Sequence, residues 1–148
     1  MQVLIDTGIL LRLLDRSDPS HAAIRQSLVK LRIRGDEPVT STQNIAEFWN
    51  VCTRPVSARG GYGLSVGETD RRVRMIERLF PVMAEAPGAY VVWRQLVVAF
   101  AVHGVQVHDV RLVALMAARG ITHLLTLNGG DFARFSGLVT PLDPAKMP

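Results

Sequence analysis

The sequence predicts a single α/β domain over residues 1–148, with a mostly parallel central sheet of about five short strands and helices on both faces. First, short apolar runs such as "VLI" before Asp6 do not alternate with polar residues, as is typical of strands covered on both faces. Second, these runs alternate with longer segments of helical periodicity, which favours parallel strands joined through helices. Third, a length of 148 residues with a hydrophobic content of 48% and no long linker fits one domain with a sizeable core.

The N-terminal segment predicts a strand followed by two helices. The strand "VLI" leads through Asp6 into a helix over "ILLRLL". In "SDPSH", Asp18 is the expected cap of the second helix and Pro19 its first helical residue, because proline is favoured at that position. Gly35 is expected to end this second helix.

A second strand and an amphipathic helix follow. "PVTS" predicts a short strand, and Thr42 is the expected cap of the helix behind it. That helix has an apolar stripe at i, i+3, i+4 and i+7, formed by Ile45, Phe48, Trp49 and Cys52. Cys52 is therefore interpreted as a small core residue. Glu47 lies away from the stripe, and periodicity allows either solvent or a polar cleft around it.

The middle of the chain combines a glycine-rich loop with a basic helix. The loop "RPVSARGGYG" carries Arg54 and Arg59, and a helix is predicted from Ser65 to about Phe80. Its buried face is expected to contain Val66, Val73 and Ile76. Its other face carries a basic stripe at i, i+3 and i+7, formed by Arg71, Arg74 and Arg78.

The C-terminal part repeats the alternation of strands and helices. A short strand is expected in "FPVMAEAPG", and a helix over about residues 89–103 is expected to end at Gly104. A further helix begins at Asp109 and closes at Gly120, since glycine is common just past a helix end. The strand "THLLTL", the turn "NGG", a short helix opening at Asp131 and a last strand in "LVTPL" complete the predicted sheet.

Composition limits the environment and the partners. One cysteine excludes an internal disulfide and favours a reducing compartment, so we expect a cytoplasmic protein. No apolar stretch is long enough and free enough of charge to suggest a membrane span. The net charge is +4, and all 17 basic residues except Lys30 and Lys146 are arginines. Arginine pairs well with phosphate, so a phosphate-rich partner is compatible with this composition, as is a simple coding bias.

Four carboxylates are candidate site residues, and two of them directly follow predicted strands, whose carboxyl ends are where open parallel sheets gather functional groups. Asp6 follows the first strand, Glu47 lies on the helix after the second, and Asp131 follows "THLLTL" after a short turn. Asp109 begins a helix of its own. The three aspartates also stand at helix starts, where each could act simply as a cap.

Asp109 fits a capping role least well. Leu112, Val113 and Met116 lie at i+3, i+4 and i+7 from it, so Asp109 heads the buried face of its helix. A charge in that place needs a partner. A divalent cation is one answer, because Mg²⁺ and Mn²⁺ prefer oxygen ligands and carboxylates supply them.

Three stretches together carry a family resemblance. "VLIDTGILLRLLD", "TSTQNIAEFWNVCTRP" and "VHDVRLVALMAARGITHLLTLNGGDFARF" resemble, in order and spacing, the PIN-domain ribonucleases, and in particular the VapC-type toxins of bacterial and archaeal toxin–antitoxin pairs. The resemblance covers nearly the whole chain and is weakest from about 56 to 90. It implies a three-layer α/β/α PIN-like fold.

The resemblance also implies a site. Four residues match the acidic metal positions of the family: Asp6, Glu47, Asp109 and Asp131. Three match the polar residues beside them: Thr7, Thr126 and Asn128. The family usually has asparagine at the position of Gly8, so an amide that would orient the site is missing here.

The implied activity is hydrolysis of RNA phosphodiester bonds by a water activated on carboxylate-bound Mg²⁺ or Mn²⁺, leaving 5′-phosphate and 3′-hydroxyl ends. The implied partners are the RNA substrate, a cognate antitoxin protein and a second copy of the chain. An acidic centre repels RNA, so a basic surround is needed. The candidates for that surround are Arg54, Arg59, Arg71, Arg74 and Arg78.

Other functions fit less well. The tripeptide "DTG" also occurs in all-β aspartic proteases, but here it leads into a helix and has no second copy. Phosphoryl-accepting receiver domains need an acidic pair after the first strand and a lysine after the last, and dehalogenase-type phosphatases need D-x-D where this chain has Gly8. The remaining alternative is a catalytically weak PIN-like module that binds RNA or regulates, which Gly8 and the arginine stripe would suit.

Overall fold

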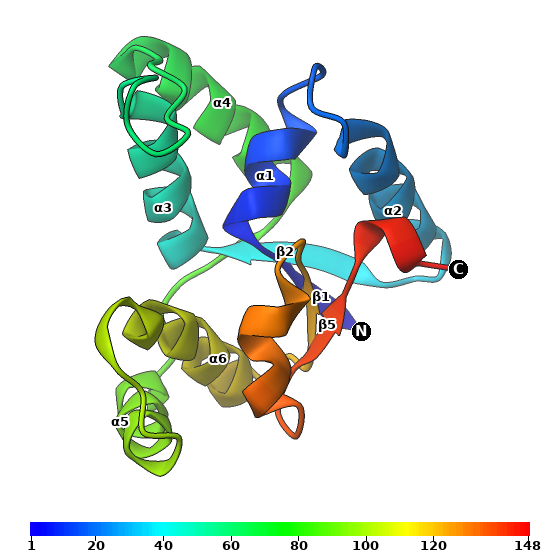
Figure 1. Cartoon of the computed structure of the whole chain (residues 1–148). Coiled ribbons are helices and arrows are strands. Elements are labelled where there is room, and N and C mark those ends of the chain that lie inside the picture. The colour runs from blue at the N-terminus through cyan, green and yellow to red at the C-terminus, as the bar shows by residue number, and fades with distance from the viewer.

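A five-stranded parallel sheet forms the centre of the structure, a computed structural model that describes residues 1–148 (Figure 1). The strand order is β3-β2-β1-β4-β5, and every neighbouring pair is parallel. The strands are β1 (Gln2–Ile5), β2 (Glu37–Ser41), β3 (Val82–Met83), β4 (His123–Leu125) and β5 (Thr140–Leu142). Because the pairing is parallel, the carboxyl ends of all five strands lie at one edge of the sheet, and the predicted α/β class is confirmed.

The helices cover both faces of this sheet. The first face carries α1 (Thr7–Leu13), α2 (His21–Ile33), α3 (Thr42–Thr53) and α4 (Val66–Leu79). The second face carries α5 (Ala89–Ala99) and α6 (Val107–Arg119). Figure 1 shows the first group above the sheet and the second below it. Three short 3-10 segments complete the chain: η1 (Gly104–Gln106), η2 (Gly129–Phe135) and η3 (Pro144–Lys146). The arrangement is the expected three-layer α/β/α sandwich.

Strand β1 separates two hydrophobic cores. Its side chains alternate between the faces, so Val3 and Ile5 pack under α1 to α4 whereas Leu4 packs against α6. All three are fully buried, which explains why the run "VLI" is apolar without alternation. Phe48 and Cys52 on α3 are also fully buried in the first core, as their helical spacing predicted.

Several element boundaries differ from the sequence predictions. Helix α2 begins at His21 with Ser20 as its cap, so the assignment of Asp18 as cap was wrong. Asp18 instead accepts the Ser20 N–H at 2.8 Å and stabilises the turn before the helix. Helix α3 is capped by Ser41, whose hydroxyl accepts the Asn44 N–H, rather than by Thr42.

Further differences arise at helix ends. Val66 was expected to be buried but is 66% exposed, because it is the first residue of α4 and the packed stripe begins one turn later. Helix α5 ends at Ala99, well before Gly104, and Ala101 has a positive φ of 48° that stops the helix. Helix α6 begins at Val107 rather than at Asp109.

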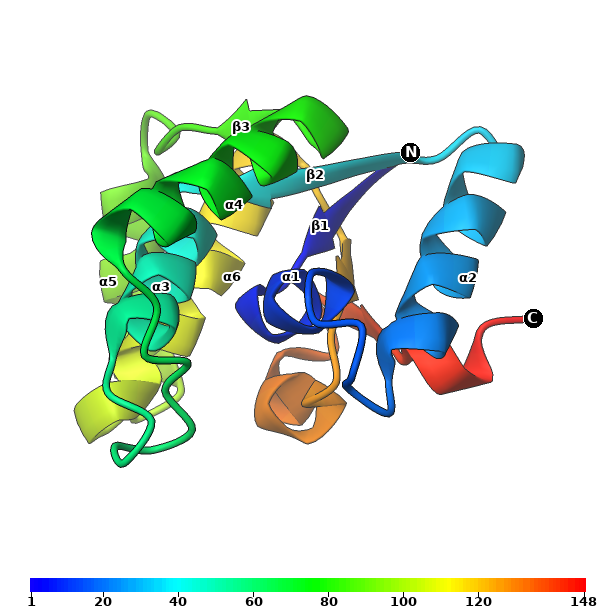
Figure 2. The same ribbon diagram turned by 90° about the horizontal axis from the view of Figure 1, so that it is seen from above.

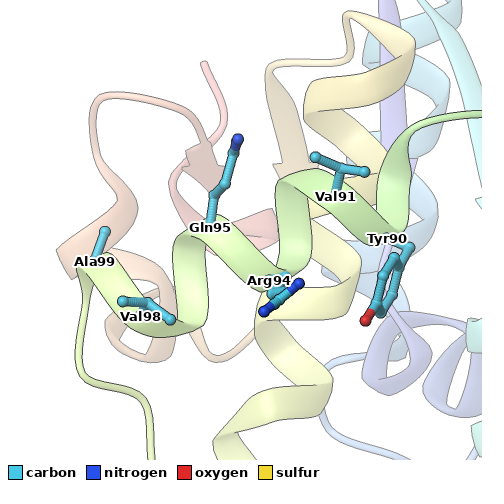
Figure 3. A pocket seen from close by; sticks show the side chains of 6 residues that line it. All are labelled: Tyr90, Val91, Arg94, Gln95, Val98 and Ala99. Carbon is cyan, nitrogen blue, oxygen red and sulfur yellow. The ribbon is translucent and has the colours of Figure 1, made fainter.

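Helix α5 exposes an apolar face. Tyr90 and Val98 are 65% and 76% exposed, and Val91 lies beside them. Figure 3 shows these side chains around a shallow depression of about 500 Å³, which is also lined by Arg94, Gln95 and Ala99. None of the four carboxylates lines it. None of the helices combines the length and the apolar composition that crossing a bilayer requires.

Candidate active site

Asp6 stands at the carboxyl end of the central strand and caps α1. Its Oδ1 accepts the Thr7 N–H at 2.8 Å, and its Oδ2 accepts the hydroxyl of Thr126 at 2.6 Å. Thr126 follows β4, which pairs with β1 in register from Val3 to Ile5. Parallel pairing therefore brings these two distant residues together, and Thr126 orients the Asp6 carboxylate.

Glu47 is held from two sides by hydrogen bonds. The Thr7 hydroxyl donates to its Oε2 at 2.8 Å, and the amide of Gln43 donates to its Oε1 at 3.0 Å. Thr7 in turn accepts a bond of 3.1 Å from the amide of Asn44, and the Asn44 amide oxygen accepts the hydroxyl of Ser41. This chain of polar groups extends from the end of β2 to the first turn of α1. Viewed from above, α1 lies between α2 and α3 (Figure 2).

Asp109 and Asp131 lie in the first turns of α6 and η2. Asp109 is half-buried and Asp131 is exposed. Neither carboxylate accepts a hydrogen bond, and none of the four carboxylates forms a salt bridge with a lysine, arginine or histidine. No ion pair within the chain therefore neutralises any of the four carboxylates, although the charge of the neighbouring His108 lowers the pKa of Asp109 slightly.

The carboxylates influence one another's protonation. Burial raises the pKa of Asp6 above its ordinary value, the hydrogen bonds from Thr126 and Thr7 oppose the rise, and the charges of Glu47 and Asp131 add to it. Burial also raises the pKa of Asp109, and the charges of Asp131, Asp6 and Glu47 raise it further. The mutual repulsion shows that the four groups share one electrostatic neighbourhood.

The donor set fits a hard divalent cation in its chemistry. All four candidate ligands are carboxylates, and oxygen is the ligand that Mg²⁺ and Mn²⁺ prefer. The four side chains do not yet surround a common point, however. No three His, Cys, Asp or Glu side chains in the structure converge closely enough to form a ready-made metal site. The tight cage that the sequence interpretation expected is thus not formed by the side chains as they stand.

A polar groove of about 740 Å³ adjoins this cluster, between α3 and α6. Glu47 and Asp109 both line it, which places two of the four carboxylates on its wall. Ala46 and Val105 are its apolar residues. The other lining residues are polar or charged: Thr42, Gln43, Asn50, His108 and Arg111.

The arginines proposed from the sequence lie elsewhere. Arg54 and Arg59 flank the loop after α3, and the stripe Arg71, Arg74 and Arg78 is exposed on α4, as predicted. None of these five residues lines the groove beside Glu47 and Asp109. The arginine that does so is Arg111, whose Nη2 forms an ion pair of 3.1 Å with Glu85.

Sequence reasoning missed Gln43, Asn44 and Arg111. The available signals were positional: Gln43 precedes Glu47 by one helical turn, and Arg111 follows Asp109 by two residues. Of the polar residues that it did name, Thr7 and Thr126 bond the carboxylates directly. Asn128 acts through its backbone, because its N–H donates to the Thr126 hydroxyl at 3.1 Å while its side chain is exposed.

Comparisons with known proteins agree with this fold. The chain is similar to VapBC-1 from nontypeable Haemophilus influenzae, with 15% identity, 99% of this chain and 100% of that chain covered, and a TM-score of 0.70. It is similar to FitAcB from Neisseria gonorrhoeae, with 16% identity, 99% and 100% coverage, and a TM-score of 0.71. It is also similar to Mycobacterium tuberculosis VapC20, a sarcin-ricin loop cleaving toxin, with 16% identity, 89% of this chain and 94% of that chain covered, and a TM-score of 0.61. At these identities the likeness shows the fold.

The family follows from sequence. No curated protein matches the chain. A family model described as "PIN domain", however, matches residues 3–138, which is most of the chain and includes all four carboxylates. The chain therefore belongs to the PIN domain family, as its N-terminal, central and C-terminal motifs predicted.

Proposed function

We propose that the protein is a Mg²⁺- or Mn²⁺-dependent endoribonuclease and acts as the toxin of a toxin–antitoxin pair. One observation carries the proposal: burial and the charges of Asp131, Asp6 and Glu47 raise the pKa of Asp109, and none of the four carboxylates forms a salt bridge within the chain. Membership of the PIN domain family and the resemblance to VapC-type toxins support the same assignment.

The four carboxylates would hold the cation. When bound, a divalent ion supplies Lewis-acid chemistry: it lowers the pKa of a water and neutralises charge on a phosphate. Modest rotations of exposed Asp131 and half-buried Asp109 are available for closing around it, since no hydrogen bond fixes either carboxylate. Asp6 and Glu47 are already oriented by Thr126, Thr7 and Gln43.

The residues of the chain then have distinct tasks in hydrolysis. Water oxygen attacks the phosphorus, the bond from phosphorus to the 3′ oxygen breaks, and that oxygen takes a proton, which leaves a 3′-hydroxyl and a 5′-phosphate. Asp109 is the proposed proton acceptor for the attacking water, because it lines the groove and burial raises its pKa above the ordinary value. Thr126 keeps Asp6 in one orientation throughout.

RNA is the proposed substrate. The groove between α3 and α6 leads to Glu47 and Asp109 and is lined mostly by polar groups, as suits a sugar–phosphate strand. Arg111 and His108 stand on its wall, where positive charge or N–H donors would contact phosphate. The exposed arginines on α4 and in the loop after α3 would extend this contact to more distant parts of the strand.

An antitoxin is the proposed protein partner. This chain shares its fold with one chain in each of the solved structures of VapBC-1 and FitAcB. A groove of about 400 Å³ between α2 and α4 has an apolar floor that includes Leu28, Met75 and Phe80. Its basic rim consists of Arg16, His21, Arg25 and Arg32. Such a surface suits a segment that carries apolar and acidic side chains.

We expect Arg25→Glu to weaken capture of the co-expressed antitoxin, with cleavage by the free toxin unchanged.

A homodimer is also part of the proposal, on the basis of the family resemblance. The exposed face of α5 supplies apolar surface for a second copy of the chain (Figure 3). Sedimentation equilibrium of the wild type and Val98→Asp tests this: the wild type should be dimeric and the variant monomeric. A monomeric wild type would remove the dimer from the proposal.

The nuclease assignment is tested with purified protein and structured RNAs, with and without Mg²⁺ or Mn²⁺. Cleavage should require the ion, produce 5′-phosphate ends, and fall by at least about 100-fold in Asp6→Asn. Gln26→Ala, at an exposed position on α2 outside the carboxylate cluster and outside the proposed RNA contacts, shows whether protein handling affects the assay. Equal cleavage by the wild type and Asp6→Asn would end the assignment.

A catalytically weak RNA-binding module is the second candidate, and Gly8 is the feature that favours it. Gly8 has no side chain where the family usually offers an amide. This candidate predicts that RNA is retained without turnover at any divalent ion. Multiple-turnover cleavage at micromolar RNA would exclude it.

A further inference from the structure

Gln43 forms a bridge between two helices that carry different carboxylates. Its Nε2 donates to Glu47 Oε1 on α3 at 3.0 Å and to the backbone carbonyl of His108 on α6 at 2.8 Å. No other side-chain hydrogen bond and no salt bridge joins α3 to α6 in the structure. His108 immediately precedes Asp109, so the bridge ends beside a second member of the carboxylate cluster.

The bridge spans two layers of the fold. Helix α3 packs in the core on one face of the sheet, whereas α6 packs in the core on the other face. Glu47 and Asp109 belong to neither core, and both line the groove between α3 and α6. The amide of Gln43 supplies a direct connection there, and both of its N–H groups can be used at once.

Gln43 supplies one of the two hydrogen bonds that orient the Glu47 carboxylate. Oε2 of Glu47 is held by the Thr7 hydroxyl and its Oε1 by Gln43, so removal of Gln43 leaves the carboxylate free to rotate about one contact. Asp109 has no side-chain partner, and its place relative to Glu47 is set through the backbone of α6. Both effects act on the same pair of carboxylates.

We propose that Gln43 is a positioning residue that sets the separation of Glu47 and Asp109 and so tunes the affinity of the site for a divalent cation. The inference rests on the proposed function, in which these carboxylates hold the ion. Groups that orient metal ligands through hydrogen bonds commonly change metal affinity by 10- to 100-fold when they are removed. Gln43 is not expected to contact the reacting atoms itself.

Gln43→Met is the sharpest test, because methionine keeps the unbranched length and lacks the donor. The matched control is Gln26→Met, an exposed glutamine on α2 whose side chain makes no hydrogen bond. Binding of Mn²⁺ alone to the RNA-free protein is measured by calorimetry or by electron paramagnetic resonance. Gln43→Met should bind Mn²⁺ about tenfold more weakly than the wild type, and Gln26→Met should bind it equally well.

The Mn²⁺ dependence of cleavage is a second measurement, and a purely structural role of Gln43 would not change it. Gln43→Met should need about tenfold more Mn²⁺ for half-maximal cleavage and should recover most of kcat at saturating Mn²⁺. If this variant fails to fold, Gln43→Asn serves in its place, since its amide is one methylene too short to reach both partners.

The outcomes separate the two proposals. Unchanged Mn²⁺ affinity in a folded Gln43 variant overturns the positioning role and leaves the nuclease assignment intact. Absence of Mn²⁺ binding in the wild type, or equal binding by the wild type and Asp6→Asn, overturns the proposed function itself. An increase in the KM for RNA with unchanged Mn²⁺ affinity also rejects the positioning role, because Gln43 would then be a substrate contact.

Discussion

Thr126 donates a hydrogen bond of 2.6 Å to Asp6 Oδ2, although the two residues lie 120 positions apart in the chain. The bond joins the ends of β4 and β1, which are neighbours in the sheet. Hydrogen bonds to a carboxylate favour its charged form, so this one holds the pKa of Asp6 down against the effect of burial. It thereby connects the topology of the sheet to the protonation state of the site.

Removal of this bond should shift the pH dependence of cleavage. In Thr126→Val the pKa of Asp6 rises further, because burial and the neighbouring charges are then opposed only by the Thr7 N–H. The acidic limb of the profile of kcat/KM should move to higher pH, whereas Thr126→Ser should retain the wild-type limb. An acidic limb that is identical in all three proteins would show that Asp6 is not the titrating group.

Thr7→Val should destabilise the protein. The buried Thr7 hydroxyl links Glu47 and Asn44, and its loss leaves the fully buried Asn44 amide without one of its acceptors. An unsatisfied buried donor costs about 1–3 kcal/mol, which urea denaturation can measure. Thr7→Ser keeps the hydroxyl and should lose less. A free energy of unfolding unchanged in Thr7→Val would mean that water replaces the hydroxyl.

Asp109→Asn should stabilise the metal-free protein near neutral pH while it abolishes cleavage. The pKa of Asp109 is raised in the folded state, so its ionised form opposes folding above that pKa and the penalty disappears below the unfolded value of 3.8. The gain in the free energy of unfolding at pH 7 is expected to be small, because Asp109 is only half-buried and solvent screens its charge.

The pH and metal controls for this variant follow from the same linkage. The difference in stability between Asp109→Asn and the wild type should shrink as the pH falls toward 4. Added Mn²⁺ should stabilise the wild type more than the variant, because only the wild type retains all four ligands. A variant that is less stable than the wild type at pH 7 would contradict the repulsion inferred for the cluster.

Gly8→Asn should fold and should increase cleavage by a few fold. A Cβ at Gly8 would meet only Arg12 Nη1, at 3.4 Å, which is the movable end of a long side chain. Gly8 lies inside α1, where asparagine is slightly more favourable than glycine. The added amide could orient the neighbouring carboxylates. Single-turnover cleavage at fixed Mn²⁺ measures the effect, and a rate no higher than that of the wild type would show that Gly8 does not limit activity.

Arg111→Ala and Arg74→Ala distinguish two routes for RNA. Arg111 lines the groove beside Glu47, whereas Arg74 on α4 pairs with Asp70 at 3.1 Å. If the strand follows the groove, Arg111→Ala lowers the slope of log affinity against log salt by about one, and Arg74→Ala leaves it unchanged. The reverse pattern would favour the basic stripe on α4. Fluorescence anisotropy of labelled RNA with the Asp6→Asn background avoids cleavage during titration.

The sequence predicted the sheet and the gathering of its acidic residues for a physical reason. The short apolar runs identify strands covered on both faces, and in a parallel sheet the residues after each strand meet at one edge. Asp6 and Asp131 could therefore be expected at the same edge without coordinates, whereas the hydrogen bond from Thr126 to Asp6 was not predicted. The helix boundaries were less predictable, because "SDPSH" and "TSTQN" each contain several residues able to cap a helix, and the choice depends on packing beyond the motif.

Gln43, Asn44 and Arg111 were missed for a different reason. Helical periodicity identifies the apolar stripe of α3 but does not rank the polar positions opposite it. The partner of Gln43 is a backbone carbonyl of α6, 65 residues away, and no side-chain pattern in the sequence marks such an acceptor. The sequence also could not predict that the four carboxylates stop short of a common metal site, since their convergence depends on side-chain rotamers at the sheet edge.

The central place of β1 has a consequence for the order of folding. Strand β1 pairs on one side with β2 and on the other with β4, which lies far away in the sequence. Contacts between distant segments form slowly, because a long loop must first be closed. Thr126 therefore reaches Asp6 only after β4 has docked on β1, so the carboxylate takes its final orientation late in folding.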